Sequence, residues 1–182
     1  MAKKILGIIG SPRKKGNTKV LVEEVLKGAE AAGAEKNSIN LYDYEIRPCV
    51  ACDGCMETKR CVVDDGMTRL RLMLDEADII VFGTPVYWWG PSAQFKAFMD
   101  RWYNPGVREK IAGKKVIIAI TMGDSEPATA SHTAGMLNDA LDYLGTDIVA
   151  TIIAMNNYNI GDILKDENVM AKAYEAGGKA VK

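Results

Sequence analysis

The sequence predicts an α/β protein with a doubly wound parallel sheet, and three observations support this fold class. Five apolar segments of strand length alternate with segments of helical periodicity. Most of the apolar segments are continuous rather than alternating, which is typical of strands buried on both faces. The chain of 182 residues has the length of one domain, so we expect a single domain over 1–182. The expected strands cover 4–10, 38–42, 78–83, 115–121 and 148–154.

The order of these elements predicts how the sheet is wound. Strand–helix–strand units with right-handed crossovers place helices on both faces of the sheet. Five such strands in the order 2-1-3-4-5 form the flavodoxin-like arrangement. Ligands of such sheets bind at the carboxyl ends of the strands, where the strand order reverses. The loops after the first, third and fourth strands are therefore the places to search for a site.

The segments between the strands predict amphipathic helices. The first helix has apolar residues at positions 20, 21, 25, 26 and 29, and we expect Asn17 or Thr18 to cap it and Gly33 to end it. We expect Pro91 to open a later helix, because proline is tolerated at a first helical position. The inward face of that helix would carry Phe95, Phe98, Met99 and Trp102. The other helices are expected around 67–74, over 130–144 and over 161–181.

Composition excludes several function classes. The chain has 23 basic and 24 acidic side chains and a net charge of −1, so nothing favours nucleic-acid or membrane-surface binding. Its longest apolar runs are much shorter than the roughly 20 residues of a membrane span. The segment after Met1 has no separate apolar region and cleavage site of a secretory signal. We therefore expect a cytoplasmic protein.

All four cysteines lie in one short loop after the second strand, within about 47–66. Cys49, Cys52, Cys55 and Cys61 have the spacing C-x2-C-x2-C-x5-C, which approaches the compact ligand run of bacterial ferredoxins. Four thiolates in one loop predict the ligands of a [4Fe–4S] cluster. Zinc, another metal or redox-active free thiols are the alternatives.

Charged residues flank the last cysteine of this loop. Lys59, Arg60, Asp64 and Asp65 could tune a cluster potential through local charge. The interpretation that we favour is that these four side chains belong to a solvated loop.

A polar loop between the first strand and the first helix predicts a phosphate site. It fits neither the P-loop pattern nor the dinucleotide-binding glycine pattern. Backbone N–H groups and the helix dipole favour an anion at this helix start. An arginine adds a guanidinium group that can donate two hydrogen bonds to phosphate oxygens. The alternative is a basic turn with an ordinary helix cap. In such a sheet the expected ligand is the mononucleotide FMN, held by Ser11, Arg13, Asn17 and Thr18.

The loop after the third strand predicts a site for a flat ring. Three consecutive aromatic residues there could stack on a conjugated ring, and the adjacent glycine permits a close backbone approach. The alternative is that individual tryptophans pack under the loop or against a second subunit. The expected ring-binding residues are Tyr87, Trp88, Trp89 and Gly90, with Thr121, Gly123 and Asp124 from the loop after the fourth strand.

Three segments of the chain resemble the iron–sulfur flavoproteins, within the NAD(P)H-dependent FMN reductase superfamily of flavodoxin-like folds. They are Ser11-Pro-Arg…Gly16-Asn-Thr, the cysteine loop through Cys61-Val-Val-Asp-Asp, and Thr84-Pro-Val-Tyr…Lys96-Ala-Phe-Met-Asp-Arg-Trp. The resemblance implies one FMN and one [4Fe–4S] cluster per subunit, in a homodimer or homotetramer. It adds Gly16 to the expected phosphate-binding residues, and Pro85 and Val86 to the expected ring-binding residues. It also implies ferredoxin or NAD(P)H as the electron donor, and oxygen, peroxide or quinone-like compounds as acceptors.

These observations predict a flavin-dependent oxidoreductase that passes electrons between a [4Fe–4S] cluster and FMN. One alternative is an NAD(P)H-dependent FMN or quinone reductase without a cluster. Another is a non-catalytic redox carrier or sensor. We expect no residue to act as a catalytic acid or base, and His132 to be a surface or cap residue at a helix start.

Overall fold

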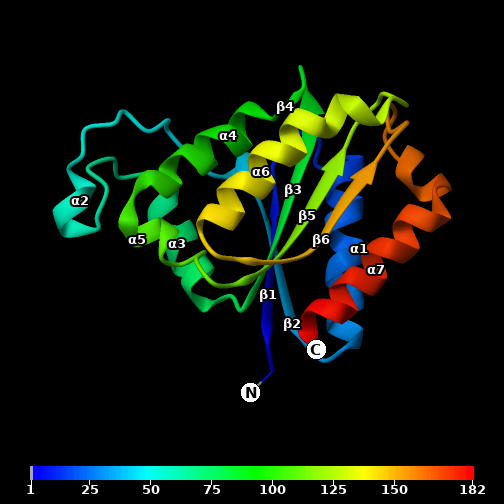
Figure 1. Ribbon diagram of the computed structural model, residues 1–182, viewed down its shortest axis with the longest axis horizontal. Helices are drawn as coiled ribbons and strands as arrows, with labels where there is room; N and C mark the ends of the chain where they lie inside the picture. The colour runs from blue at the N-terminus through cyan, green and yellow to red at the C-terminus, as the bar shows by residue number, and fades with distance from the viewer. Residues whose placement is uncertain (1) are drawn as a thin grey trace.

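The computed structural model describes residues 2–182 and shows a parallel sheet between two layers of helices (Figure 1). The path through the six-stranded sheet is β2-β1-β3-β5-β6, and the short β4 pairs only with β3. Without β4 this is the order 2-1-3-4-5 predicted from the sequence, so the flavodoxin-like fold is confirmed. All neighbours along the main path pair in parallel.

The elements have the following bounds. The strands are β1 (Lys4–Ile9), β2 (Glu35–Asn40), β3 (Ile79–Tyr87), β4 (Gly90–Pro91), β5 (Lys115–Thr121) and β6 (Asp147–Ala154). The α-helices are α1 (Asn17–Ala31), α2 (Cys55–Thr58), α3 (Met67–Glu76), α4 (Ala93–Asp100), α5 (Pro105–Arg108), α6 (Ser131–Tyr143) and α7 (Glu167–Val181). The 3-10 segments are η1 (Leu41–Asp43), η2 (Arg101–Tyr103), η3 (Pro127–Ala130) and η4 (Asp162–Lys165).

Each face of the sheet has its own apolar cluster. Helices α1 and α7 cover one face, while α3, α4 and α6 cover the other (Figure 1). Two glycines bring α1 and α7 into close contact. A Cβ at Gly28 would lie 1.8 Å from the carbonyl oxygen of Tyr174, and a Cβ at Gly177 would lie 1.9 Å from that of Val25. The backbones of the first and last helices therefore touch directly.

Two helix starts differ from the prediction. Among the described residues no side chain caps α1, whose N-cap residue is Gly16, so the expectation that Asn17 or Thr18 caps this helix is wrong. Helix α4 begins at Ala93 instead of Pro91, and the Ser92 hydroxyl accepts a hydrogen bond from the Phe95 N–H at 3.2 Å. Pro91 is extended because it pairs with Val86 in the β3–β4 hairpin.

Other boundaries shift by a few residues. The second strand covers Glu35–Asn40, earlier than the predicted 38–42, because Leu41 and the two residues after it turn into η1. Gly33 follows the end of α1 with a φ of +94°, the left-handed conformation expected of a glycine that ends a helix. The predicted last helix over 161–181 divides into η4 and α7. None of the helices within residues 2–182 combines the length and apolar character that crossing a bilayer requires.

Candidate functional site

The carboxyl end of β3 and the segments that follow β1, β5 and β6 surround a cavity of about 370 Å³. The carboxyl ends of these four strands lie along the upper edge in Figure 1. The reversal of strand order between β1 and β3 places this cavity where ligands of doubly wound sheets bind. Its lining residues are Ser11, Arg13, Asn17, Thr18, Pro85, Val86, Tyr87, Thr121, Met122, Gly123, Asp124, Asn157 and Tyr158.

The loop after β1 presents free backbone donors to this cavity. Hydrogen bonds from Gly10 N–H to the Gly83 carbonyl (2.7 Å) and from Gly16 N–H to the Arg13 carbonyl (2.8 Å) hold the loop. A Cβ at Gly16 would lie 3.0 Å from the Arg13 carbonyl oxygen, so the turn is tight. The N–H groups of residues 17–19 have no protein acceptor among the described residues. Free N–H groups at a helix start are the donors that a phosphate needs.

The hydroxyl groups of Thr18 and Thr121 add a further hydrogen-bond donor to the lining of the cavity. The side-chain oxygens of Thr18 and Thr121 lie 2.6 Å apart and are buried. One hydroxyl hydrogen fills this contact, so the other remains available to an acceptor in the cavity. Asn17 also lines the cavity, but its amide is hydrogen-bonded to the loop after β6.

The β3–β4 hairpin places the predicted aromatic residues unequally. Tyr87 lines the cavity together with Pro85 and Val86. Trp88 and Trp89 form the turn with φ values of +50° and +60°, and Trp88 is 92% exposed. Both tryptophans lie outside the cavity lining, as do Gly90 and Gly16. The other ten predicted cofactor-binding residues are brought together around one cavity.

Two hydrogen bonds hold the side chain of Asp124 in the loop after β5. The Thr129 hydroxyl donates to Asp124 Oδ2 at 2.7 Å, and the Glu126 N–H donates to Oδ1 at 3.0 Å. The Thr129 hydrogen bond, followed by that from Glu126, lowers the pKa of Asp124 below its ordinary value. Asp124 is therefore a fixed anionic residue at one side of the cavity.

Two lining residues, Asn157 and Tyr158, belong to a loop that was not predicted to form the site, whereas Met122 lies within the predicted loop after the fourth strand. Asn157 and Tyr158 follow β6, and the polar run after this strand was a signal in the sequence, because it too ends at the carboxyl edge. The amide nitrogen of Asn157 donates to the Met155 carbonyl at 2.6 Å. Its Oδ1 is buried and has no hydrogen-bond partner within residues 2–182. An unpaired buried acceptor beside a cavity is a favourable place for a ligand hydroxyl.

The cysteine loop forms a second site at one side of the molecule, where it projects with α2 (Figure 1). All four cysteines are free thiols and border one small cavity, together with Tyr103 and Asn104 of the segment after α4. Within residues 2–182, no three His, Cys, Asp or Glu side chains form a group that could hold a metal ion. The loop therefore gathers the four sulfurs around one cavity without metal-site geometry.

The backbone of this loop is strained. Ala51, Asp53 and Lys59 have φ values of +49°, +56° and +56°. Left-handed conformations cost about 1–2 kcal/mol for residues with a Cβ, and such strain is concentrated at functional sites. Burial raises the pKa of the Cys55 thiol, and the neighbouring cysteines raise it further.

The flanking charges are not all solvated, which corrects one prediction. Asp65 and Arg101 form an ion pair whose side chains are only 1% and 2% exposed. Lys59 does lie at the surface, where it pairs with Glu109 at 2.7 Å. Asp64 and Arg60 are exposed as expected, and so is His132 at the start of α6.

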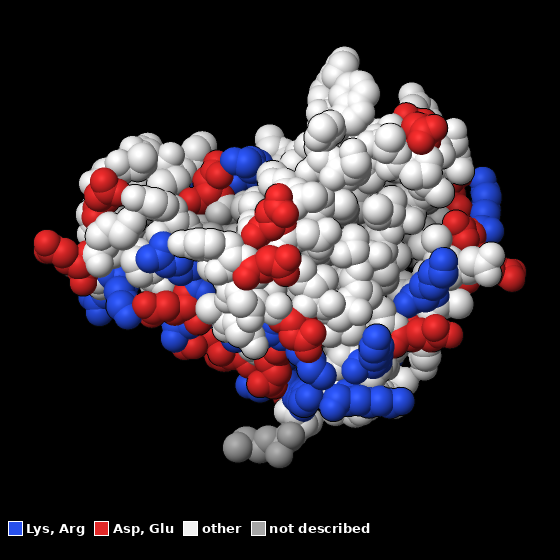
Figure 2. Space-filling model, in the orientation of Figure 1, with Lys and Arg blue, Asp and Glu red and all other residues white. Residues whose placement is uncertain are grey.

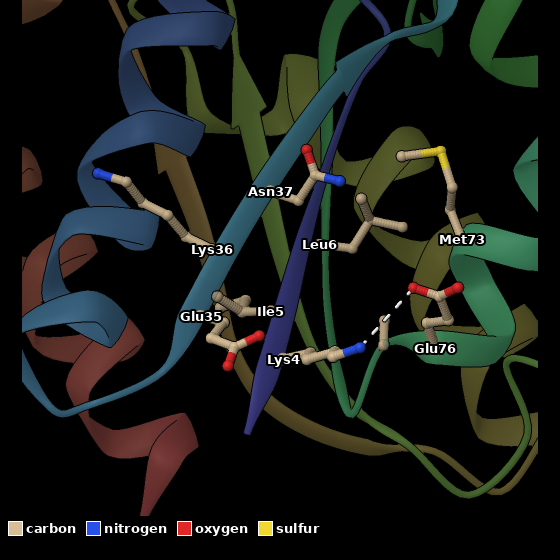
Figure 3. Close-up of a pocket in the computed structure, with 9 residues that line it drawn as sticks. Lys4, Ile5, Leu6, Glu35, Lys36, Asn37, Met73 and Glu76 are labelled. Atoms are coloured by element: carbon tan, nitrogen blue, oxygen red, sulfur yellow. Dashed lines mark ion pairs between the residues drawn. The ribbon is translucent and has the colours of Figure 1, made fainter. Parts of the chain in front are cut away.

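A further cavity, of about 280 Å³, lies at the opposite end of the sheet, beside the amino ends of β1 and β2 (Figure 3). The ion pair between Lys4 and Glu76 (3.8 Å) lies at its edge, and Leu6 and Met73 contribute apolar surface. Charged side chains gather over the lower half of the face in Figure 2, whereas few surround β4 at the upper edge. The cavity in Figure 3 thus lies apart from the cavity at the carboxyl edge.

Comparisons with known proteins agree with this geometry. Residues 3–160 match the family model for NADPH-dependent FMN reductase. An iron–sulfur flavoprotein of Methanocaldococcus jannaschii is 44% identical over 128 residues, which cover 68% of this chain and 66%, slightly under two thirds, of that protein. An iron–sulfur flavoprotein of Archaeoglobus fulgidus is 31% identical over 179 residues, covering 97% of this chain and 78% of the relative.

A solved structure shows the same fold. The NAD(P)H:quinone oxidoreductase from Methanothermobacter marburgensis has a TM-score of 0.73 at 18% identity, and the match covers 98% of this chain and 96% of that one. The resemblance drawn from the three sequence segments is confirmed by the family match and the two relatives. The chain therefore belongs to the NADPH-dependent FMN reductase family and, within it, to the iron–sulfur flavoproteins.

Proposed function

We propose that this flavin-dependent oxidoreductase passes electrons between FMN and a [4Fe–4S] cluster held by Cys49, Cys52, Cys55 and Cys61. The observation that carries the proposal is the presence of two separate cavities in one chain, one at the carboxyl edge of the sheet and one bordered by all four cysteines. FMN, when bound, accepts one or two electrons and supplies the organic chemistry. The protein binds and orients the cofactors.

The residues of the first cavity fit FMN. The free N–H groups at the start of α1 and the hydroxyls of Ser11 and Thr18 would bind its phosphate, with Arg13 close to them. The segment from Pro85 to Tyr87 would line one side of the flavin ring, and Thr121, Gly123 and Asp124 the other. The unpaired Oδ1 of Asn157 is suited to a hydroxyl donor of the ribityl chain.

The residues of the second cavity fit a cluster in ligand type and number. Four cysteine sulfurs are the usual ligands of a [4Fe–4S] cluster. The left-handed residues Ala51 and Asp53 lie between successive cysteines, so the backbone turns repeatedly around the cavity. Conformations of this kind persist where function compensates for their energetic cost.

The same proposal covers the partners. We propose ferredoxin or NAD(P)H as the electron donor, and oxygen, peroxide or quinone-like compounds as acceptors. We also propose a homodimer or homotetramer in the cytoplasm. The names of the relatives support the cluster, and the family supports a nicotinamide donor.

A second candidate is an NAD(P)H-dependent FMN or quinone reductase without a cluster. It is favoured by the match of residues 3–160 to the family model for NADPH-dependent FMN reductase. A non-catalytic redox carrier or sensor is the remaining alternative. Turnover of any acceptor at a useful rate would exclude a carrier, and bleaching of bound flavin by NADPH in cluster-free protein would support the reductase.

The deciding experiment is an absorption spectrum combined with iron and acid-labile sulfide analysis of protein purified without oxygen. We expect flavin bands, a broad iron–thiolate absorbance, and about four irons and four sulfides per chain. Flavin bands without iron or sulfide would contradict the cluster and leave the reductase. Absence of flavin under conditions that saturate the site would contradict the whole proposal.

A further inference from the structure

We infer that Asn17 is a positioning residue that clamps the loop after β6 onto residues 10–18, which we call the phosphate loop. We also infer that the Asn17 side chain does not bind the phosphate. This inference rests on the proposed FMN site. It concerns the loop of residues 155–161, which joins β6 to η4 and which we call the β6 loop. The β6 loop supplies one wall of the cavity through Asn157 and Tyr158.

Both polar atoms of the Asn17 side-chain amide form hydrogen bonds with the β6 loop. Its Nδ2 donates to the Asn157 carbonyl at 3.1 Å and to the Asn159 carbonyl at 2.7 Å. Its Oδ1 accepts from the Gly161 N–H at 2.9 Å. Both amide hydrogens and one acceptor site are therefore filled by backbone groups of residues 140 to 144 positions later in the chain.

The orientation of this amide is determined by its partners. Two carbonyl oxygens require a donor and one N–H requires an acceptor, so a flipped amide would face oxygen with oxygen and N–H with N–H. Asn17 is also only 6% exposed. A phosphate that recruited its Nδ2 would take this donor from the buried Asn157 carbonyl or the partly buried Asn159 carbonyl, which is unfavourable. The free N–H groups of residues 17–19 are better donors for the phosphate, because binding it breaks no hydrogen bond of theirs within the described residues.

The β6 loop has tethers at both ends. Arg13 Nη1 donates to the Tyr158 carbonyl at 3.0 Å, so a second residue of the phosphate loop holds it. The Asn157 N–H donates to the Met122 carbonyl at 2.8 Å. At its far end, the Asn159 N–H donates to Asp162 Oδ2 at 2.6 Å. The clamp therefore fixes the wall of the cavity that Asn157 and Tyr158 form, and its loss would affect every flavin that needs this wall.

This reasoning predicts a specific signature for Asn17→Ala. The dissociation constants of FMN and riboflavin, measured by flavin fluorescence titration of the full chain, would both rise by roughly tenfold, the effect of about one or two lost hydrogen bonds. Their ratio would stay unchanged, because riboflavin differs from FMN only in lacking the phosphate. Backbone hydrogen exchange over 155–161 would become faster.

Two outcomes would overturn the inference. A loss of affinity for FMN with unchanged affinity for riboflavin would make Asn17 a direct phosphate ligand. Unchanged exchange over 155–161 would show that the amide does not hold the β6 loop. If the unaltered chain bound neither flavin, the proposed function would fail first, and the exchange measurement would still test the clamp.

A second variant keeps the test independent of the phosphate loop. Asp162→Ala releases the β6 loop at its far end, and among the described residues the Asp162 side chain forms no hydrogen bond with the phosphate loop. We expect the same parallel loss for FMN and riboflavin, in weaker form, with faster exchange over 155–161. Lys165→Ala is the matched control, because the Lys165 side chain pairs with Asp162 at the surface and, within residues 2–182, forms no hydrogen bond with the β6 loop. An equal effect of both substitutions would contradict the assignment.

Discussion

Arg101 Nη1 donates to Asp65 Oδ2 at 2.6 Å, and this buried pair joins the two ends of the cysteine loop. Arg101 also donates to the Arg47 carbonyl at 2.9 Å, ahead of the first cysteine. Asp65, after the last cysteine, accepts from the Arg47 N–H at 3.0 Å. One guanidinium from η2 and one carboxylate therefore close the base of the loop.

Asp65→Asn should destabilise the protein strongly. The substitution leaves the Arg101 guanidinium buried without a counter-charge, and breaking a buried pair in this way costs about 3–5 kcal/mol. The free energy of unfolding from urea denaturation would measure it. The control is Asp64→Asn at the exposed neighbouring position, which should change stability by less than about 0.5 kcal/mol. Equal effects of the two substitutions would contradict the importance of the pair.

The Asp65–Arg101 pair also predicts a pH dependence. Burial alone would raise the pKa of Asp65, but hydrogen bonds from Arg101, Arg47 and Met67 outweigh it and lower the pKa. A lowered folded-state pKa stabilises the protein fully above the unfolded-state value of about 3.9 and loses this effect as pH falls through the folded-state value. The stability gap between the unaltered protein and Asp65→Asn should thus be complete at neutral pH and shrink in acid below that value. A gap that stays constant on acidification would argue against this linkage.

Cys52→Ala tests the ligand assignment. Cys52 borders the small cavity with the other three cysteines, so we expect loss of iron and sulfide while FMN stays bound at the separate carboxyl-edge cavity. Anaerobic metal analysis and the flavin spectrum would measure both. Val50→Ala alters an exposed neighbour at the same cavity and should retain the cluster. Iron content that survives Cys52→Ala would show that the ligand set is wrong.

Trp88→Asn should stabilise the protein slightly. Trp88 is in the left-handed conformation and almost fully exposed, so it contributes strain and little burial. Asparagine tolerates this conformation and is common in two-residue hairpin turns, so unfolding should require up to about 1 kcal/mol more. Thermal and urea unfolding would measure the change, with Tyr143→Ser as an exposed helical control. A loss of stability that depends on protein concentration would instead show that a second subunit covers Trp88.

Local sequence patterns were sufficient to predict the sheet. Continuous apolar runs such as β1 and β5 are buried on both faces, and the helices that follow them, α1 and α6, have a clear apolar periodicity. The β3–β4 hairpin was missed because its turn contains Trp88 and Trp89, neither of which is typical of left-handed turns. Pro91 was consequently assigned to a helix instead of a strand.

Contacts between distant segments could not be predicted from local patterns. Asp65 looked solvated because its neighbours are charged, whereas its partner Arg101 lies 36 positions later. The side chain of Asn17 appeared free to cap α1, whereas its partners begin 140 positions later. The residues of the carboxyl-edge cavity were largely predicted, because the strand order determines which loops meet there.

The direct contact of Gly28 with Tyr174 and of Gly177 with Val25 has a consequence for biosynthesis. Helix α1 alone does not cover its face of the sheet, because α7 packs on the same face and against α1. A nascent chain that still lacks residues 167–181 exposes the part of this apolar face that α7 covers, and exposed apolar surface promotes aggregation. Translation arrest before Glu167 would therefore leave a chain that has all six strands of the sheet and is nevertheless prone to aggregate.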